Sequence, residues 1–113
     1  GAVWGSMNLN GQQLPEYQNG AWTIPAEDRQ VAIIHTLTID PARAGQGLAR
    51  QMVAFAEDTA RRQGKTVLRL DTGTENLPAN RMYPALGYKA AGTVDTFFMG
   101  DSQRPLNLYE KKL

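Results

Sequence analysis

The segment from Val31 to Asp40 is nearly continuous in apolar and β-branched residues and ends at Pro41. This pattern predicts a central, buried β-strand. Because side chains alternate along a strand, Thr36 and Thr38 are expected on one face. The opposite face is expected to carry the odd positions, which are Val31, Ile33, His35, Leu37 and Ile39.

From about Gly47 to Gln63 the apolar residues recur with the period of a helix. Gly64 supplies the expected C-terminal stop. The stripe predicted to face the core consists of Leu48, Met52, Phe55, Ala56 and Thr59. Opposite charges four residues apart predict a solvated face without a functional role, formed by Glu57 with Arg61 and by Asp58 with Arg62.

Two segments precede the central strand. Ala2 to Asn10 is a predicted strand, closed by the Asn10-Gly11 turn. The polar stretch from Gly11 to Arg29 is long for a hairpin loop, and loops of that length are often functional. The alternative is a floppy connector in which Trp22 packs on the core.

The elements after the long helix alternate in type. They are a strand from Thr66 to Asp71, a short helix from Leu77 to Leu86, and strands over Tyr88 to Asp95 and Leu106 to Lys112. Asn76 is the expected cap of the short helix, and Gly87 ends it. The last two strands are joined by a Gly- and Pro-containing loop with Phe97 and Phe98 exposed.

This order of strands and helices is that of an α/β domain. The unit from Val31 to Asp71 is long enough for a crossover between two parallel strands. Ligands of such sheets gather at the carboxyl ends of strands, where the turn with Gly45 and Gly47 lies. A chain of 113 residues has room for one domain.

The glycine turn stands at the start of the long helix, where it favours binding of an anion. The first amides of a helix have no intrahelical partner, and the macrodipole adds partial positive charge there. A phosphate or pyrophosphate can therefore bind by main-chain hydrogen bonds, and glycines let it approach closely. The alternative is a turn that only packs one element on the next.

Two other phosphate-binding motifs can be compared with this turn. A P-loop needs Lys followed by Ser or Thr, and Leu48 and Ala49 stand there instead. A dinucleotide-binding turn is a better rival, because Asp71 ends the next strand at about the distance of a ribose-binding acid. However, Arg50 occupies the position of the third glycine, where helix packing needs a small residue.

Two motifs, in order and spacing, resemble the acetyl-coenzyme A (acetyl-CoA) half of the GNAT superfamily of N-acetyltransferases. The first joins Ile39-Asp40-Pro41 to Gly45-Gln46-Gly47-Leu48-Ala49, and the second runs from Asn76 through Tyr83 to Gly87-Tyr88. The resemblance covers roughly Ala2 to Leu113. It implies an α/β fold with a mixed, mostly antiparallel sheet, a splayed pair of parallel strands and two helices.

The resemblance also implies acetyl-CoA as cosubstrate and assigns residues to it. The amides of the loop would hold its pyrophosphate, and exposed strand backbone would pair with its pantetheine arm. By position, the cofactor-binding residues are Gly45, Gln46, Gly47, Leu48 and Ala49 for the pyrophosphate, Leu37 and Ile39 for pantetheine, and Asn76 for the arm. The family usually has Gln or Arg where this chain has Ala44, so Arg43 or Arg50 would substitute as a phosphate contact.

The implied reaction is direct attack of a primary amine on the acetyl thioester. Tyr83 matches the family's acid, since a phenol can protonate or hydrogen-bond the departing sulfur; it could equally be a core tyrosine. His35 is a candidate base, with a core histidine as the alternative. Asp71 is a weaker candidate for orienting the acceptor. Pro84 predicts a disturbed helix at Tyr83.

The family usually begins with a strand, two helices and another strand that form much of the acceptor wall, and no segment here corresponds to them. The expectation is one N-terminally truncated domain over residues 1–113, with an exposed sheet edge that pairs with a second copy or a complementing fragment. A domain that binds coenzyme A, or only interacts with a partner, without turnover is the alternative.

Composition narrows the partners. A net charge of +1 without a basic run argues against nucleic acid or an anionic membrane. The chain has no cysteine and one histidine, which excludes thiolate and multi-histidine metal sites. No stretch reaches the ~18 apolar residues of a membrane span, so the cytoplasm is the predicted location. The acceptor is expected to be a small-molecule or peptide amine.

Overall fold

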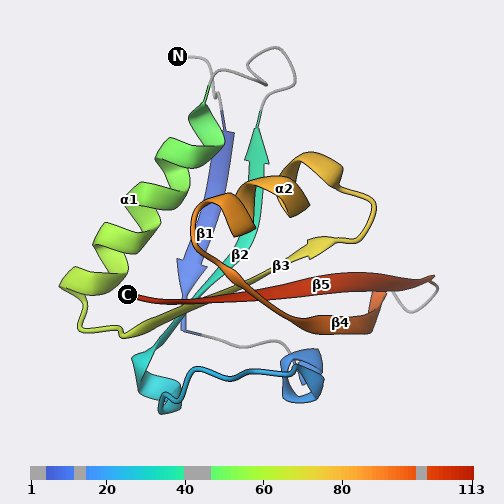
Figure 1. The fold of residues 1–113 in the computed structure, drawn as a ribbon, viewed down its shortest axis with the longest axis horizontal. Coiled ribbons are helices and arrows are strands. Elements are labelled where there is room, and N and C mark those ends of the chain that lie inside the picture. Colours follow the sequence, from blue (N-terminus) through green and yellow to red (C-terminus); the bar gives the residue numbers. More distant parts are fainter. Residues whose placement is uncertain (1–4, 12–14, 40–46, 99–101) are drawn as a thin grey trace.

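The computed structural model describes residues 5–11, 15–39, 47–98 and 102–113, with the backbone alone at 5, 6, 16, 35, 36, 38, 39, 96–98 and 102–104. Its elements, shown in Figure 1, are β1 (Gly5–Asn10), the 3-10 helices η1 (Pro15–Asn19) and η2 (Asp28–Gln30), β2 (Val31–Ile39), α1 (Leu48–Arg62), β3 (Val67–Gly73), α2 (Leu77–Ala85), β4 (Lys89–Phe98) and β5 (Ser102–Lys112). Among the helices within these ranges, none is both long and apolar enough to cross a bilayer.

The five strands form one sheet in the order β1-β2-β3-β5-β4. Only β2 and β3 run parallel, and the other three neighbouring pairs are antiparallel. The long helix α1 connects the two parallel strands, as the crossover unit predicted. The mixed, mostly antiparallel sheet expected from the sequence is therefore confirmed.

The two parallel strands separate partway along their length. Their pairing runs only from Val31 opposite Val67 to Ile34 opposite Leu70. Beyond that point β2 stays with β1 up to Ile39, while β3 stays with β5. Figure 1 shows β2 and β3 diverging here. The splayed pair is thus confirmed, and we call the opening between β2 and β3 beyond Ile34 and Leu70 the wedge.

The alternation predicted for β2 is wrong beyond Ile34, because the strand contains a β-bulge at His35. In the pairing with β1, Asn8 lies opposite Thr36 and Leu9 opposite Ile34, so His35 is the extra residue. The bulge shifts the following side chains by one position. Leu37 consequently packs on the same cluster as Ile34, instead of sharing the face of Val31 and Ile33 as predicted.

Apolar clusters cover both faces of the sheet. The helices α1 and α2 lie on one face, over a cluster that contains Ile34, Leu70 and Tyr83. On the other face, Tyr17 and Trp22 from the segment between β1 and β2 cover Ile33 and Leu108. The sheet is therefore sandwiched between two helices and the residues 15–30, which we call the 15–30 segment.

The buried face of α1 differs from the predicted stripe. It consists of Val53, Ala56, Glu57 and Ala60, whereas Phe55 is 62% exposed. Small alanines at this face let the helix approach the sheet closely. Glu57 was expected on a solvated face, but it is buried because groups from distant parts of the chain hold its carboxylate. Asp58 pairs with Arg61 at 3.3 Å and not with Arg62 as expected.

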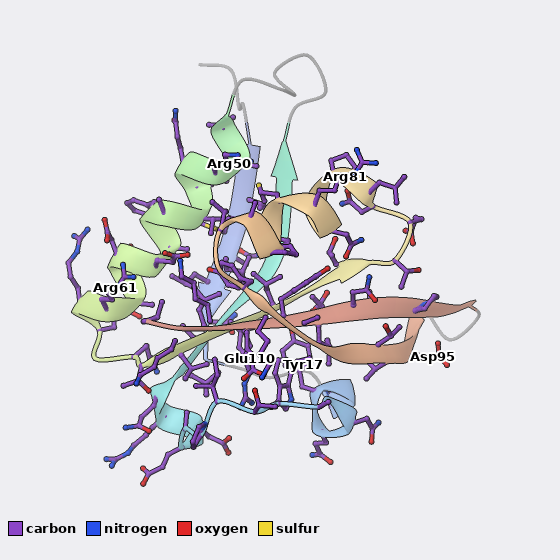
Figure 2. The ribbon with its side chains drawn as sticks, viewed as in Figure 1. Tyr17, Arg50, Arg61, Arg81, Asp95 and Glu110 are labelled. Atoms are coloured by element: carbon purple, nitrogen blue, oxygen red, sulfur yellow. The ribbon has the colours of Figure 1, made fainter. Side chains whose placement is uncertain are left out.

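The 15–30 segment is anchored along its length, so the floppy connector is not what the structure shows. The amide of Ala21 donates to the carbonyl of Ala91, which a bulge in β4 turns outward. The amides of Thr23 and Ile24 each donate, at 2.9 Å, to the buried carboxylate of Glu110 in β5. Figure 2 labels Glu110 and Tyr17, which both belong to the face of the sheet that the 15–30 segment covers. Trp22 packs on the core, as expected.

The hairpin of β4 and β5 is longer than predicted. Phe97 and Phe98 lie in β4 and pair with Gln103 and Ser102, not in a loop. Pro105 suggested an end to the strand, because proline cannot donate to a ladder. Pro105 fits into β5 because the pairing of β3 with β5 stops at Leu106, the next residue. The missing N–H of Pro105 therefore costs no hydrogen bond of the β3–β5 ladder.

Candidate functional site

The first part of the site is the N-terminus of α1. Gly47 is the N-cap with φ 75°, and its carbonyl accepts the amide of Gln51 at 3.2 Å. The amides of Leu48, Ala49 and Arg50 are therefore the unpaired donors of the first turn. The predicted contacts Arg43, Gly45 and Gln46 lie outside the described residues.

The backbone at this helix start is open to a ligand. A Cβ built on Gly47 has no atom within 4 Å among the described residues. The left-handed conformation there favours glycine, and the missing side chain leaves the first-turn amides accessible. Figure 2 shows Arg50 at this end of α1 and Arg61 at the other. The donor set, main-chain N–H groups at a helix N-terminus, fits a phosphate group.

The second part is the wedge, on the side of β2 that faces β3. Beyond Ile34, the backbone of β2 pairs with β1 on one side only. Main-chain groups up to Ile39 that point toward β3 are therefore available to another extended group. Leu37 and Ile39 are on this stretch, as predicted, and so is the backbone of His35. The His35 side chain lies outside the described part.

The third part is α2, which starts beside the end of β3. Asn76 is its N-cap, and its side-chain oxygen accepts the amide of Ala79 at 3.3 Å, so the predicted cap is confirmed. Pro84 lies inside the helix without ending it. Its missing N–H falls near the C-terminus, and the helix continues through Tyr83 to Ala85, against the predicted disturbance.

Asn80 is a residue that the sequence interpretation missed. Its side-chain nitrogen donates to the carbonyls of Gly73 and Asn76 at 3.0 and 2.9 Å. Its side-chain oxygen accepts from Asn107 at 2.9 Å and from the Tyr109 hydroxyl at 2.7 Å. One amide thus holds α2 against the ends of β3 and β5. The sequence feature that could have identified Asn80 is its position one helical turn after the capping residue Asn76.

Tyr83 is fixed by the way α2 ends. Gly87, with φ 93°, donates to the carbonyl of Pro84, and the amide of Tyr88 donates to the carbonyl of Tyr83, both at 3.0 Å. These two bonds form a Schellman motif. The rings of Tyr83 and Tyr88 meet edge to face, with centroids 5.6 Å apart. The backbone and ring of Tyr83 are therefore both constrained.

The hydroxyl of Tyr83 differs from those of the other three tyrosines. Tyr17 donates to Asp71, Tyr88 to Glu57 and Tyr109 to Asn80. Tyr83 is only 3% exposed, and its hydroxyl makes no hydrogen bond to any residue of the described chain. Burial, followed by the nearby charge of Asp71, raises the pKa of Tyr83 to about 12. The phenol therefore stays protonated as a donor at neutral pH.

Asp71 lies where β3 leaves β2. It is the residue after Leu70, the last to pair with β2, and its Oδ2 accepts from the Tyr17 hydroxyl at 2.6 Å. Its charge raises the pKa of both Tyr17 and Tyr83. The predicted residues Asp71 and Tyr83 are thus close enough to interact. Tyr17 was missed, because its segment has no periodic pattern.

The sequence model of the acetyltransferase (GNAT) family matches residues 9–88, which is more than half of the chain. The chain therefore belongs to the GNAT family, as its two motifs suggested. The strand order, the splayed parallel pair and the two helices agree with this assignment.

Known proteins show the same likeness. An uncharacterized N-acetyltransferase of Methanocaldococcus jannaschii is 32% identical over 68 residues, which are 60% of this chain and 30% of that protein. An N-acetyltransferase structure from Staphylococcus aureus has a TM-score of 0.74 at 19% identity, over 98% of this chain and 61% of that one. A Salmonella typhimurium structure with its cofactor acetyl-CoA has a TM-score of 0.66 at 24% identity, over 83% and 54%.

The chain therefore spans about a third of this curated relative and little more than half of these solved structures. At these identities the two structures establish the fold. The activity of the protein is a separate question, addressed next from its own residues.

Proposed function

We propose that the protein is an acetyl-CoA-dependent N-acetyltransferase, which transfers the acetyl group to a primary amine by direct attack on the thioester. The observation that carries this proposal is the placement of the wedge. It opens at Ile34 and Leu70, and both residues belong to the cluster that holds Tyr83. An open main-chain edge and a buried phenol without a described partner thus adjoin the same point of the sheet.

The proposed acetyl-CoA site extends from α1 into the wedge. Main-chain amides of the glycine loop bind the pyrophosphate, the strand end pairs with pantetheine, and side chains complete the contacts. The residues are Gly45, Gln46, Gly47, Leu48 and Ala49, then Leu37 and Ile39, then Arg43 and Asn76. The open backbone at Gly47 supports the pyrophosphate position. Bound acetyl-CoA supplies an activated acyl group whose sulfur can leave.

Tyr83 is the proposed donor to that sulfur. Its pKa of about 12 lies above the value near 8.5 of an ordinary thiol. Complete proton transfer to a thiolate is therefore unfavourable, and the phenol stabilises the departing sulfur by donating a hydrogen bond. His35 is the proposed base for the amine, and its place at the β2 bulge supports this role.

The test combines binding with turnover. Acetyl-CoA at about one hundred times its dissociation constant should raise the free energy of unfolding by ~2.7 kcal/mol. A panel of small-molecule and peptide amines is then screened for release of the coenzyme A thiol. Tyr83→Phe should lower the rate about 10- to 100-fold, whereas Tyr109→Phe, which removes a hydroxyl bonded to Asn80, serves as the matched control.

Each outcome assigns the protein to one class. Stabilisation with thiol release supports the acetyltransferase. Stabilisation without thiol release supports a domain that binds coenzyme A without catalysing a reaction. This second candidate is retained because the chain covers only 30% and 54% of the length of two proteins that it resembles. Stabilisation by a dinucleotide in place of acetyl-CoA would refute both.

We also propose that the protein pairs with another chain through β1, and that it acts in the cytoplasm. In the sheet, β1 has a neighbour on one side only, and edge strands offer unpaired groups to a second chain. A second copy or a complementing fragment would add a strand there. Light scattering at micromolar concentration tests the first possibility, and a strictly monomeric species would leave only the second.

A further inference from the structure

Tyr83 lies between two other tyrosine rings. The centroid of its ring is 5.6 Å from that of Tyr88, which meets it edge to face, and 5.6 Å from that of Tyr109, whose plane is inclined at 40° to it. All three residues are buried, with 3 to 5% of each exposed. Because protein interiors are closely packed, neighbouring rings restrict one another. The direction of the Tyr83 phenol therefore depends on what holds its two neighbours.

The two neighbouring tyrosines are held in different ways. Tyr109 is part of β5 and pairs with Leu70 of β3 on one side and with Ala90 of β4 on the other. The sheet therefore fixes its backbone whether or not its hydroxyl is bonded. Tyr88 follows the end of α2 and precedes β4, so it lies outside the paired strands of the described sheet. Its amide donates to the carbonyl of Tyr83 at 3.0 Å, and its ring depends on a second point of attachment.

Glu57 of α1 supplies that attachment. The hydroxyl of Tyr88 donates to its Oε2 at 2.8 Å, and the two residues are only 4% and 8% exposed. Burial, followed by the hydrogen bond and the charge of Glu57, raises the pKa of Tyr88, so the hydroxyl remains the donor. A hydrogen bond to an ionised group is stronger than one between neutral groups, and burial strengthens it further. The bond therefore ties the Tyr88 ring to the long helix.

Two cations hold the Glu57 carboxylate in turn. The ammonium group of Lys111 lies 3.1 Å from Oε1 and 3.2 Å from Oε2, and the Arg61 guanidinium lies 3.8 Å from Oε1. Lys111 also donates to the carbonyl of Leu86 at 2.8 Å, and its nitrogen is 5.4 Å from the centre of the Tyr88 ring. The buried carboxylate is therefore charge-balanced and held from several directions, and the same lysine binds the end of α2.

We propose that Glu57 is a positioning residue for the acetyl transfer: by holding the Tyr88 ring it keeps the Tyr83 phenol directed at the thioester sulfur. The inference rests on the acetyltransferase activity proposed above and deepens it. Loss of the bond to Glu57 leaves Tyr83 in its cluster but lets the adjoining ring of Tyr88 move. A small displacement of a donor removes much of its effect on a transition state, since that effect depends on geometry.

The first test observes Tyr83 directly and needs neither acetyl-CoA nor an amine. The tyrosines are labelled with carbon-13 at Cζ, and the NMR signal of Tyr83 is the one that Tyr83→Phe lacks. Burial raises the pKa of Tyr83 to about 12 in the wild type. Glu57→Ala and Tyr88→Phe should lower this pKa toward the ordinary value near 10, because a mobile neighbouring ring admits water. Asp58→Ala is the matched control; it removes the exposed carboxylate at the next position and should leave the pKa unchanged.

The second test measures initial rates with acetyl-CoA and the most active amine of the panel described above. Glu57→Ala should lower kcat about 3- to 10-fold and leave the KM of acetyl-CoA unchanged. Glu57→Gln should keep kcat within about twofold of the wild type, because its amide oxygen still accepts the Tyr88 hydroxyl. Asp58→Ala should leave kcat unchanged. Rescue by the amide would show that the hydrogen bond to Tyr88, and not the charge, carries the effect.

The decisive comparison introduces Tyr88→Phe into two backgrounds. In the wild type it should lower kcat about 3- to 10-fold. In Tyr83→Phe, which has no phenol to position, it should leave the remaining kcat unchanged. A general loss of packing would instead lower kcat in both backgrounds. Tyr88→Phe keeps the ring and loses only the hydroxyl, so it decides alone if thermal unfolding shows that Glu57→Ala does not fold.

Three results overturn the inference: a pKa of Tyr83 that is the same in Tyr88→Phe as in the wild type, a kcat of Tyr88→Phe equal to that of the wild type, or an equal loss of kcat with and without the Tyr83 phenol. Failure of the proposed function looks different. In that case no amine of the panel releases the coenzyme A thiol, while the NMR titration still shows whether Glu57 holds Tyr83 in place.

Discussion

The hydroxyl of Tyr88 donates a 2.8 Å hydrogen bond to Oε2 of Glu57, a buried carboxylate 31 positions earlier in the chain. Lys111 of β5 binds the same carboxylate at 3.1 Å and also donates to the carbonyl of Leu86 at 2.8 Å. These contacts connect α1, the end of α2 and the last strand. Because Tyr88 forms part of the motif that ends α2, they also secure the position of Tyr83.

Glu57→Ala should therefore lower the free energy of unfolding by about 2 to 3 kcal/mol, because it leaves the Tyr88 hydroxyl and the Lys111 ammonium without this partner. Asp58→Ala removes an exposed carboxylate from the next position and should change stability by less than about 0.5 kcal/mol. Urea denaturation of both variants measures the difference. Equal effects would mean that the buried carboxylate is not a structural anchor.

Gly47→Ala should destabilise the protein by about 1 kcal/mol and weaken the binding of acetyl-CoA. The conformational cost comes from φ 75°, because the added Cβ meets no described atom within 4 Å. Gly64, at the other end of α1, has φ 80° and the same open surroundings. Gly64→Ala should show a similar loss of stability with unchanged binding. Calorimetric titration of both variants would contradict the pyrophosphate site if their affinities were equal.

Asn80→Ala should cost about 2 to 3 kcal/mol of stability, since it removes hydrogen bonds to Gly73, Asn107 and Tyr109 together. Arg81 is exposed on the same helix, and Figure 2 shows its side chain directed outward. Arg81→Ala should stay within about 0.5 kcal/mol of the wild type. Thermal unfolding compares the two, and an Asn80→Ala variant as stable as Arg81→Ala would refute this role.

Alkaline pH should reveal the buried state of Tyr83. Its pKa of about 12 in the folded chain exceeds the ordinary value near 10, so the unfolded chain releases this proton first. The raised pKa of Tyr83 contributes about 3 kcal/mol to the free energy of unfolding. This contribution is fully present below about pH 10 and is lost as the pH rises through the pKa of the folded state.

Tyr83→Phe lacks this titration. The wild type should therefore lose more stability than Tyr83→Phe between about pH 9.5 and pH 11.5, as measured by urea denaturation at each pH. Tyr17 and Tyr88, whose pKa values are also raised, remain in both proteins and contribute equally to the two curves. A constant difference between the curves would show that the Tyr83 phenol is not buried.

Local patterns predicted the elements of this fold well. The presence of the helix α1, the stops at Gly64 and Gly87 and the Asn76 cap depend on neighbouring residues, and the structure has all of them, although α1 buries a different face from the predicted one. The bulge at His35 could not be found in this way, because it exists only relative to the register of β1. The alternation predicted for Leu37 failed for that reason.

The missed contacts share one physical cause. In the sequence, Glu57 has the position of an exposed helix charge, and only the fold brings Tyr88 and Lys111 into contact with it. Tyr17 lies in a segment whose apolar residues show no periodic pattern. Both side chains take their roles from partners that are distant in the sequence. By contrast, the helix N-terminus at Gly47 was predictable, since its donors belong to the backbone.

The wedge between β2 and β3 has a consequence for how this protein can diversify. A ligand that pairs with the main chain beyond Ile34 is recognised through atoms common to every amino acid except proline. Replacing the side chains of Leu37 or its neighbours while keeping the strand would preserve that recognition. Under the function proposed above, side chains that contact the acceptor can therefore change by mutation while the main-chain contacts to acetyl-CoA are kept.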